Sequence, residues 1–538
     1  MKRLSLFFAV FLAAFGLAAF GLAAFGLAAE EKSAPAAAPK PPNIVFIFSD
    51  DHALKAIGAY KGALIKTPNI DRIASMGTVF ERSYCANSLC GPSRACILTG
   101  KHSHLNGYLK NNDQAPFDGK QFTFPQVLQS AGYQTALFGK WHLESDPTGF
   151  DSWQVFPGQG YYYNPHMYGT GPAGRMNKLK IPGYSTDMVT ELSLNWLKQR
   201  DPNKPFLLMC QHKAPHRSFA PALRHLNLYK DVKFPEPPTL FDDYAKRSAT
   251  LAKNTMSIDR SFQWDSDLKV PGNLPFARPQ QLKHKDSERP RMTPEQGAAW
   301  DAAFKAENDE LIANPPKGQD LVRWQYQRYM KNYMRTVAAV DESVGQILDY
   351  LEAKHLTENT IIVYSADQSF YLGEHGWFDK RWMFEESFAM PLIMSWPGVT
   401  KPGSRVQQMV QNIDYAPTFL DAAGIAVPAD VQGRSLRPIL VDEKAPWRDA
   451  LYYHYYEDGG EHTVPFHEGV ATNRYKLINF YADGEMNLFD LEKDPLELKS
   501  VHAEPAYAEV LKQMKSKLEE LRTQYKLPER PTRKVKSK

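Results

Sequence analysis

The 538-residue sequence contains only four cysteines, Cys85, Cys90, Cys96 and Cys210. So few cysteines exclude a fold that depends on many disulfides. Their spacing also matches none of the usual zinc-binding patterns. Each cysteine therefore needs its own explanation, and a small buried side chain is the simplest one.

An excess of charge of one sign is also missing, because 64 lysines and arginines nearly balance 60 aspartates and glutamates. Nucleic-acid binding requires a concentrated basic surface. The basic residues cluster only in the C-terminal tail, 531–538, which we interpret as a soluble terminus. We therefore expect no nucleic-acid partner.

A long apolar run, Leu4–Ala29, follows Lys2 and Arg3 at the N-terminus. A basic start, an apolar stretch and small residues at its end predict a signal peptide over 1–29. The Ala- and Pro-rich segment 30–42 is then a flexible leader. We expect an exported protein, periplasmic or secreted, with no stable membrane partner unless the signal stays uncleaved as an anchor.

Short apolar runs alternate with helical patterns over 43–397, which predicts an α/β fold with a mostly parallel sheet between helices. The predicted strands are Asn43–Ser49, Gln134–Gly139, Pro205–Gln211, Thr360–Ser365 and Pro391–Ser395, and the clearest helices are Pro68–Met76, Phe124–Ala131 and Leu321–Leu356.

Three regions follow from these patterns. The main domain is predicted over 43–440, with an irregular insertion at 217–318 that is polar and rich in proline. Short strands and an amphipathic helix, Ala506–Tyr525, predict a C-terminal subdomain over 441–530. We expect it to hold a smaller antiparallel sheet packed against that helix.

Polar clusters stand where four predicted strands end. In open α/β sheets, ligands bind beyond the carboxyl ends of the strands. The sequence therefore predicts one shared site for these clusters: Asp50 and Asp51, Lys140 and His142, His212 and His216, and Asp367 and Gln368.

Cys90 opens a helical pattern in the run Cys90-Gly91-Pro92-Ser93-Arg94, since proline favours the first turn of a helix. The free amides of a helix N-terminus favour an anion, and Arg94 adds a forked cation. This arrangement indicates a nucleophile that faces an oxyanion. The alternative is a buried structural cysteine beside a helix cap.

This run, completed by Leu98-Thr99-Gly100, resembles the signature of the type I, formylglycine-dependent sulfatases of the alkaline phosphatase superfamily. The resemblance implies an alkaline-phosphatase-like fold and hydrolysis of sulfuric esters. It also implies that a formylglycine-generating or other sulfatase-maturating enzyme oxidises Cys90 to formylglycine.

The resemblance assigns roles to the clustered residues. Asp50, Asp51, Asp367, Gln368 and the modified Cys90 correspond to the ligands of Ca²⁺, with Mg²⁺ as a possible substitute. The catalytic set that the resemblance implies is completed by residues that bind sulfate (Arg94, Lys140 and Lys380), remove a proton (His142) and contact the leaving group (His216, with Lys380 as an alternative acid).

The segments Lys101–Gly107 and Phe370–Arg381 are similar to the N-acetylglucosamine-6-sulfatase branch, although Ser369 departs from its pattern. This similarity implies cleavage of a 6-O-sulfate from a sulfated carbohydrate, with His212, His375 and Trp377 as substrate contacts.

Three other functions remain open. The chain could be another carbohydrate sulfatase, acting on a galactose or uronic acid sulfate. It could hydrolyse phosphonates or phosphodiesters within the same superfamily. A non-catalytic glycan-binding protein is the alternative from another class.

Overall fold

The computed structural model describes residues 40–111, 114–171 and 174–532. The predicted signal peptide, most of the leader and most of the basic tail lie outside these residues. Pro41–Lys538 forms one compact unit. Among the described helices, none has both the length and the apolar character needed to cross a membrane.

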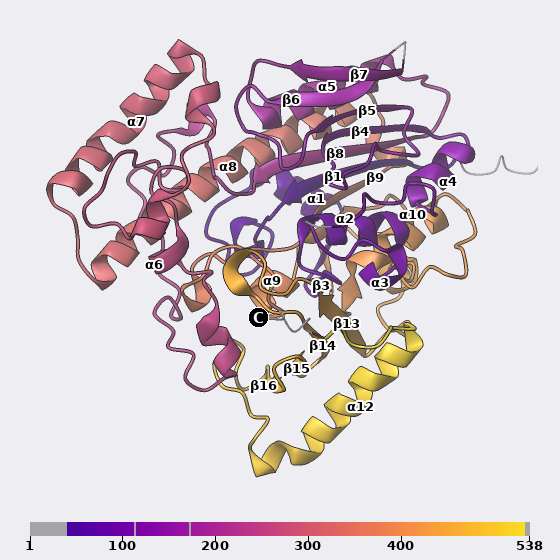
Figure 1. The fold of residues 1–538 in the computed structure, drawn as a ribbon. Coiled ribbons are helices and arrows are strands. Elements are labelled where there is room, and N and C mark those ends of the chain that lie inside the picture. Colours follow the sequence, from indigo (N-terminus) through magenta and orange to yellow (C-terminus); the bar gives the residue numbers. More distant parts are fainter. Residues whose placement is uncertain (1–39, 112–113, 172–173, 533–538) are drawn as a thin grey trace, which may run out of the picture. The chain divides into compact units, whose positions relative to one another are not determined.

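A large mixed sheet forms the centre of this unit, in the order β11-β2-β10-β9-β1-β8-β4-β5-β6-β7 (Figure 1). Its middle strands, which run parallel, are β9 (Thr360–Ala366), β1 (Asn43–Asp50), β8 (Phe206–Pro215), β4 (Gln134–Lys140) and β5 (Ser152–Phe156). The outer strands are β10 (Leu392–Ser395), β2 (Thr78–Phe80), β11 (Ser404–Val406), β6 (His166–Gly171) and β7 (Gly174–Lys180).

Helices cover both faces of the sheet, because its middle strands are apolar on both sides. One face packs against α1 (Pro68–Met76), α5 (Ser185–Gln199) and α8 (Gln319–Ala353). The other face packs against α2 (Cys90–Thr99), α4 (Phe124–Ser130) and α10 (Tyr415–Ala422). The predicted α/β class is confirmed, and so are the parallel middle strands. The shorter elements around this core are α3 (Ser103–Asn106), α9 (Glu385–Phe388), α11 (Arg437–Val441), β3 (Ser83–Tyr84) and β12 (Val410–Gln411).

The insertion at 217–318 is largely irregular but contains two α-helices, α6 (Ile258–Ser261) and α7 (Pro294–Ala313). The long helix α7 is preceded by Thr293, whose side chain caps it by accepting a hydrogen bond from Gln296 N. Its buried face carries Trp300, Phe304 and Leu311. Figure 1 shows α7 beside the main sheet, near one end of α8.

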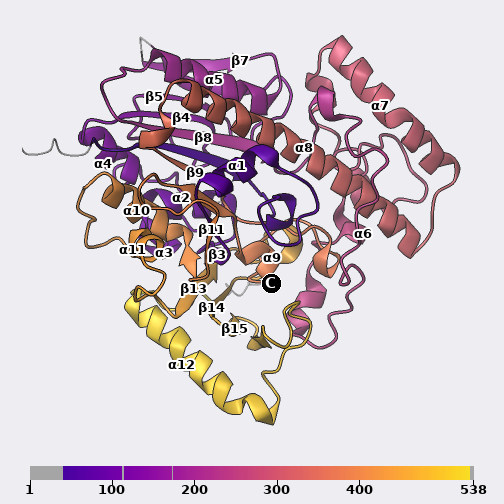
Figure 2. The ribbon, with the colours of Figure 1, turned by 180° about the vertical axis from the view of Figure 1, so that it is seen from behind.

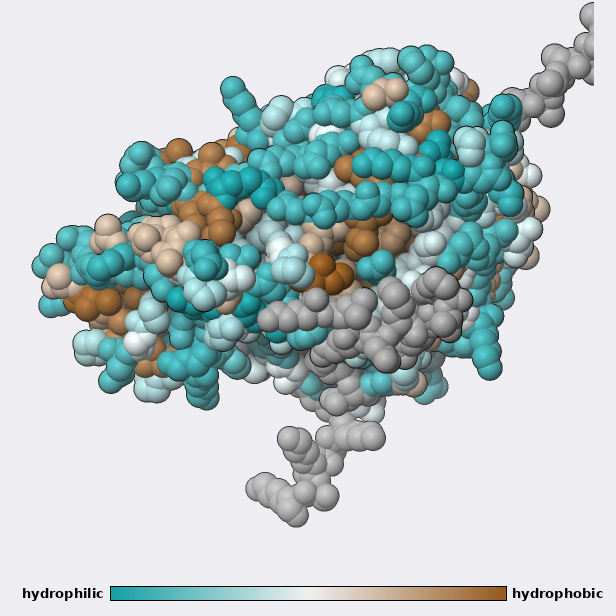
Figure 3. Space-filling model, turned by 90° about the horizontal axis from the view of Figure 1, so that it is seen from above, coloured by the Kyte–Doolittle hydropathy of each residue, from teal (hydrophilic) through white to brown (hydrophobic). Residues whose placement is uncertain are grey.

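The C-terminal region forms an antiparallel sheet of β13 (Ala450–Tyr455), β14 (His467–Thr472), β15 (Tyr475–Phe480) and β16 (Glu485–Asp490). The helix α12 (Ala508–Gln524) covers one face through Met514, Leu518 and Leu521 (Figure 2). The predicted small sheet with its helix is confirmed, and β16 is an additional strand. The face shown in Figure 3 is mostly hydrophilic, with scattered apolar patches.

Candidate active site

The polar clusters at the strand ends meet around Cys90, which is the first residue of α2 and is fully buried. Ligand atoms of Asp50, Cys90 and His216 lie within 4.8 Å of one another. The same holds for carboxylate oxygens of Asp50, Asp51 and Asp367. Of the residues expected to converge at the strand ends, Asp50, Asp51, His216 and Asp367 therefore lie together around Cys90.

Asp51 is held from several sides. Its backbone has a positive φ of 64°, and its N–H donates to Asp367 Oδ1 at 3.0 Å. Its carbonyl oxygen accepts from Tyr333 Oη at 2.6 Å. On the side chain, Oδ2 lies 2.6 Å from Lys380 Nζ. The strained backbone is thus fixed by neighbours that also aim its carboxylate at the site.

The three carboxyl groups, of Asp50, Asp51 and Asp367, differ in their pKa values. Burial raises the pKa of Asp51 to about 6, although Lys380 opposes this rise. Burial and the neighbouring Asp50 raise the pKa of Asp367 to about 8. Burial also acts against ionisation of Asp50, but Lys140 in contact with it holds the pKa of Asp50 well below its usual range. Crowded carboxylates of this kind favour a bound cation.

A divalent cation fits these residues. Asp50 Oδ1 and Gln368 Oε1 are buried, and neither has a hydrogen-bond partner within the described chain. Such buried acceptors carry a desolvation cost that a cation would offset. Asp50, Asp51, Asp367 and Gln368 offer oxygen donors, which suit Ca²⁺ or Mg²⁺.

Arg94 joins three strand ends. Its Nε and Nη2 donate to Asp367 Oδ2 at 3.2 and 3.0 Å. Its Nη1 donates to the carbonyl oxygen of Lys140 at 2.8 Å and to Gln211 Oε1 at 3.0 Å. A forked guanidinium can make these contacts at once, and an ammonium group cannot.

Two histidines face the cluster. His216 Nδ1 lies 2.6 Å from the carbonyl oxygen of Arg217, and its Nε2 lies 3.6 Å from Asp51 Oδ2. Burial lowers the pKa of both His142 and His216 well below the usual value, and Lys140 lowers both further. Both rings are therefore neutral at pH 7 before a substrate adds negative charge.

The Cys90 thiol is a poor nucleophile in this environment. Burial and the nearby Asp50 raise the pKa of Cys90 to about 12, against the opposing effect of Lys140. A thiol with this pKa stays protonated at neutral pH, and the thiolate is the reactive form.

Comparisons with known proteins agree with this geometry. The sulfatase family model matches residues 42–425. The chain belongs to the sulfatase family. It is therefore a sulfuric ester hydrolase with an alkaline-phosphatase-like fold, and the non-catalytic alternative is wrong. A second family model, N-sulphoglucosamine sulphohydrolase C-terminal, matches residues 373–524.

This sulfatase is 46% identical to an N-acetylglucosamine-6-O-sulfatase of Bacteroides thetaiotaomicron, over 90% of this chain and 87% of that protein. It is 27% identical to the human N-acetylglucosamine-6-sulfatase, over 80% and 70%. A solved structure in complex with its substrate, D-glucosamine-2-N,6-O-disulfate, matches with a TM-score of 0.86 and 46% identity, over 91% and 99% of the two chains.

His212 does not face the cluster. Its ring is fully buried on the side of α8, with Nε2 3.0 Å from Ser343 Oγ and 3.5 Å from Cys210 Sγ. Successive side chains of a strand point to opposite faces, so His212 points away from its neighbour Gln211 and the site. The predicted substrate contact of His212 is therefore at odds with the structure.

His375 and Trp377 are also interior residues, each 1% exposed. His375 Nδ1 lies 2.8 Å from Asp242 Oδ2, and Nε2 lies 3.7 Å from Glu386 Oε2. Trp377 stacks between Tyr244 and Trp382 at ring-centroid distances of 5.5 and 5.7 Å. Both rings contact partners inside the chain and neither lines the cavity beside His216, so their role as substrate contacts stays a prediction.

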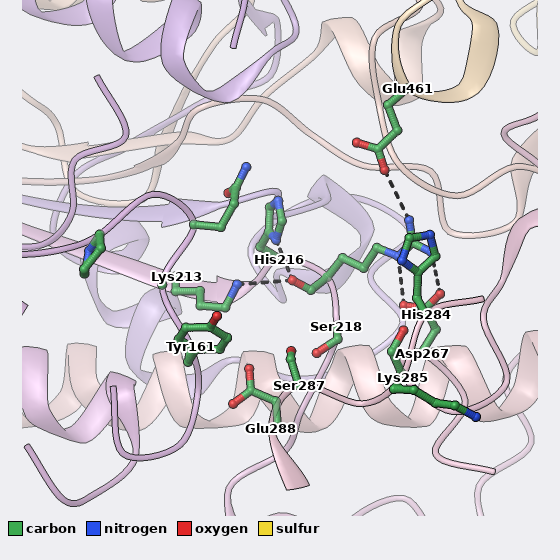
Figure 4. Close-up of a pocket in the computed structure, with 15 residues that line it drawn as sticks. Tyr161, Lys213, His216, Ser218, Asp267, His284, Lys285, Ser287, Glu288 and Glu461 are labelled. Atoms are coloured by element: carbon green, nitrogen blue, oxygen red, sulfur yellow. Dashed lines mark hydrogen bonds and ion pairs between the residues drawn. The ribbon is translucent and has the colours of Figure 1, made fainter. Parts of the chain in front are cut away.

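A cavity of about 440 Å³ opens beside His216 (Figure 4). We call it the charged pocket. Its walls come from the 157–161 loop, from Lys213 and the residues that follow it, from the 266–267 and 284–288 segments of the insertion, and from Glu461. Gln159 links it to the cluster, since Gln159 Oε1 accepts from Lys140 Nζ at 2.5 Å.

Sequence reasoning missed most residues of the charged pocket. The irregular pattern of the insertion did not show which of its side chains point toward the site. Glu288 illustrates this point, because its two carboxylate oxygens accept the backbone N–H groups of Tyr162 and Tyr163 at 3.0 Å. A glutamate between Ser287 and Arg289, in a charged stretch without periodicity, gives no such signal.

The C-terminal sheet contacts the segments that carry two residues of the site. Tyr453 Oη donates to the carbonyl oxygen of Arg381 at 2.7 Å and lies 2.5 Å from Ser88 Oγ. His454 N donates to the carbonyl oxygen of Ala86 at 3.1 Å. The segments that carry Cys90 and Lys380 are thus both tied to β13 in this sulfatase.

Proposed function

We propose that this sulfatase removes the 6-O-sulfate of N-acetylglucosamine, through a formylglycine made from Cys90. The observation that carries the proposal is the convergence of three carboxylates, two lysines and two histidines on the buried first residue of α2. The 46% identity to an N-acetylglucosamine-6-O-sulfatase supports this sugar and sulfate position.

Residue 90 needs modification for this chemistry, because a thiol carries no second hydroxyl whose deprotonation could release sulfate. A formylglycine supplies, as its hydrate, one hydroxyl for attack on sulfur and a second hydroxyl whose deprotonation releases sulfate. The proposal therefore includes a maturating enzyme as a partner. It also includes export to the periplasm or medium, which the N-terminal sequence supports.

A calcium or magnesium ion would be held by Asp50, Asp51, Asp367 and Gln368, together with residue 90. Such an ion supplies positive charge that stabilises charge developing on sulfuryl oxygens.

The cationic side chains hold the sulfate. Lys140 and Lys380 enter the site from two sides, each in contact with one carboxylate of the cluster. They orient the ester and balance its charge as the bond between sulfur and the sugar oxygen breaks. Arg94 acts mainly by fixing Asp367 and the end of β4.

The histidines move protons. His142 Nδ1 is buried without a hydrogen-bond partner in the described chain, and a neutral ring can accept a proton from residue 90. His216 directs Nε2 into the site. A bound sulfate ester would add negative charge beside this ring and favour its protonated form, which then protonates the departing sugar oxygen.

The residue-90 mechanism is tested with Cys90→Ala and Cys90→Ser. Both variants should lose hydrolysis of 4-nitrophenyl sulfate and of N-acetylglucosamine 6-sulfate while their circular dichroism stays unchanged. Active wild-type enzyme should yield a peptide with an aldehyde at position 90 by mass spectrometry. Substantial turnover by the alanine variant would refute the mechanism.

The substrate is tested with a panel of sulfated monosaccharides. We expect release of sulfate from N-acetylglucosamine 6-sulfate to exceed that from galactose and uronic acid sulfates. Activity on a galactose sulfate alone would reject the sugar assignment but keep the sulfatase class. Faster cleavage of 4-nitrophenyl phosphate or phosphonate esters than of sulfate esters would favour a phosphonate or phosphodiester hydrolase.

A further inference from the structure

Lys213 lies in the charged pocket and has no role in the proposed reaction. It belongs to the end of β8, three residues before His216, and is only 3% exposed. Its Nζ lines the pocket and donates to the carbonyl oxygen of Arg217 at 3.2 Å (Figure 4). A buried ammonium group is therefore held by a neutral acceptor beside the reacting cluster.

Two other cations near the site, Arg217 and Lys380, differ, because each has a carboxylate partner. Arg217 pairs with Asp267 at 2.7 Å, and Lys380 pairs with Asp51. Within the described chain, no carboxylate oxygen lies within 4 Å of Lys213 Nζ. Glu288 lies near enough to act electrostatically on Lys213, but backbone N–H groups occupy both of its oxygens.

This arrangement favours an anion from outside the chain. A buried cation without a close counter-charge carries a desolvation cost, and a bound anion would offset it. Burial lowers the pKa of Lys213 to about 8, with a contribution from Lys140, so the ammonium form still predominates at neutral pH.

The same pocket offers a face for a sugar ring. Tyr161 lines it and is 39% exposed, and the Arg291 guanidinium lies 4.0 Å from its ring centroid. The stacked guanidinium orders the tyrosine and leaves ring surface open. The pocket therefore combines an aromatic surface with a buried cation, beside the histidine that contacts the leaving group.

We propose that Lys213 is a specificity-determining residue that binds a second anionic group on the substrate, apart from the sulfate that is removed. This inference rests on the proposed function. The second anion has two possible sources of the same chemistry: an N-sulfate on the amino sugar itself, or a uronic acid carboxylate on the neighbouring sugar.

Three substrates distinguish these sources. N-acetylglucosamine 6-sulfate carries no second anion, glucosamine-2-N,6-O-disulfate carries one on the same ring, and a uronic acid–N-acetylglucosamine 6-sulfate disaccharide carries one on the next ring. The value of kcat/KM is measured for each with wild type, Lys213→Met and Lys213→Arg. Lys198→Met, which removes an exposed lysine of α5, is the matched control.

We expect Lys213→Met to lower kcat/KM for one anion-bearing substrate about 10-fold or more relative to N-acetylglucosamine 6-sulfate, since a hydrogen bond to a charged group is worth this much. The loss should appear mainly in KM, and Lys213→Arg should recover part of it. The anion-bearing substrate whose kcat/KM falls relative to N-acetylglucosamine 6-sulfate identifies the source of the second anion.

Equal changes on all three substrates, or no change on any, would overturn the inference while leaving the proposed function intact. Failure of the wild type on every 6-sulfated glucosamine, with turnover of 4-nitrophenyl sulfate retained, would instead reject the proposed sugar and this inference with it.

Discussion

Arg94 holds three strand ends together in addition to supplying positive charge. Its contacts run to Asp367 after β9, to the end of β4 and to Gln211 on β8. In the proposed mechanism Lys140 and Lys380 contact the sulfate, and their positions depend on the strand ends that Arg94 joins. The sequence motif predicted the charge of Arg94 but not this bridging role.

Arg94→Lys should lower kcat by about 100-fold or more, comparable to the loss of one preorganised charge-stabilising donor, because lysine keeps the charge but not the fork. Steady-state assays with 4-nitrophenyl sulfate measure this effect. A lysine variant with near wild-type kcat would contradict this bridging role of Arg94. Arg82→Lys, which alters an arginine that contacts Asn473 away from the site, serves as control.

His375 gives the stability of the chain a defined pH dependence. Burial acts to lower its pKa, but Asp242 and Glu386 outweigh burial and raise it from 6.5 to about 9. A histidine pKa that is higher in the folded state adds stability below pH 6.5, and this stability is lost as the pH rises through 9.

We expect the free energy of unfolding to fall by about 3 kcal/mol across this range from His375 alone. Urea unfolding at a series of pH values measures the fall. In His375→Gln the protein should be less stable at pH 6.5, and its stability should depend less on pH. An unchanged slope in that variant would show that other groups carry the effect.

Sequence patterns identified the residues of the cluster because the strands end where their polar residues begin. They did not show the surroundings of His212, His375 and Trp377, because a motif does not show which way a side chain points. For His212, one step along β8 reverses the face. For His375 and Trp377, partners distant in sequence, such as Asp242 and Tyr244, make the environment.

At the scale of elements, the sequence predicted the buried strands and the helices between them, because hydrophobic periodicity and strand ends are local properties of the chain. Helix α1 matches its predicted bounds, Pro68–Met76. Helix α7 was missed, although Thr293 and Gln296 form a capping box at its start. Its buried face depends on contacts with α8 and the insertion, which no local pattern encodes.

Strand β14 approaches the loop that carries Lys380 at Gly469. A Cβ atom at this position would meet Met383 Sδ and would lie 2.5 Å from the carbonyl oxygen of Leu477. Met383 follows Lys380 by three residues. The absence of a side chain at Gly469 therefore lets the C-terminal sheet and the active-site loop come together.

Gly469→Ala should destabilise the protein by about 1–3 kcal/mol through overpacking and should also lower kcat, because the loop must shift. Thermal unfolding and sulfate release measure the two effects. Adding Met383→Ala should recover only part of the stability, since the backbone contact with Leu477 remains. Full stability in the single variant would disprove this close packing.

At the scale of the whole molecule, the proposed cation should contribute to stability as well as catalysis, because it binds the folded chain and not the unfolded chain. Chelation should lower the Tm, and added Ca²⁺ should restore it by an amount that corresponds to about 2.7 kcal/mol at 100 times its Kd. Differential scanning calorimetry measures the change.

The matched variant for this experiment is Asp367→Asn, which removes one of the crowded carboxylates. Chelator and Ca²⁺ should shift its Tm less than that of the wild type. Equal Tm values with and without chelator in the wild type, and metal-free protein by elemental analysis, would exclude the cation.

The complete burial of Cys90 also restricts the order of events in the life of the chain. Residue 90 is the first residue of α2 and lies behind segments tied to β13, whose residues are made more than 350 positions later. An enzyme that needs to reach the Cys90 side chain has access only while those later segments are still missing or unpaired. If Cys90 is modified as proposed, maturation and folding therefore compete for time, and a chain that folds first keeps its thiol.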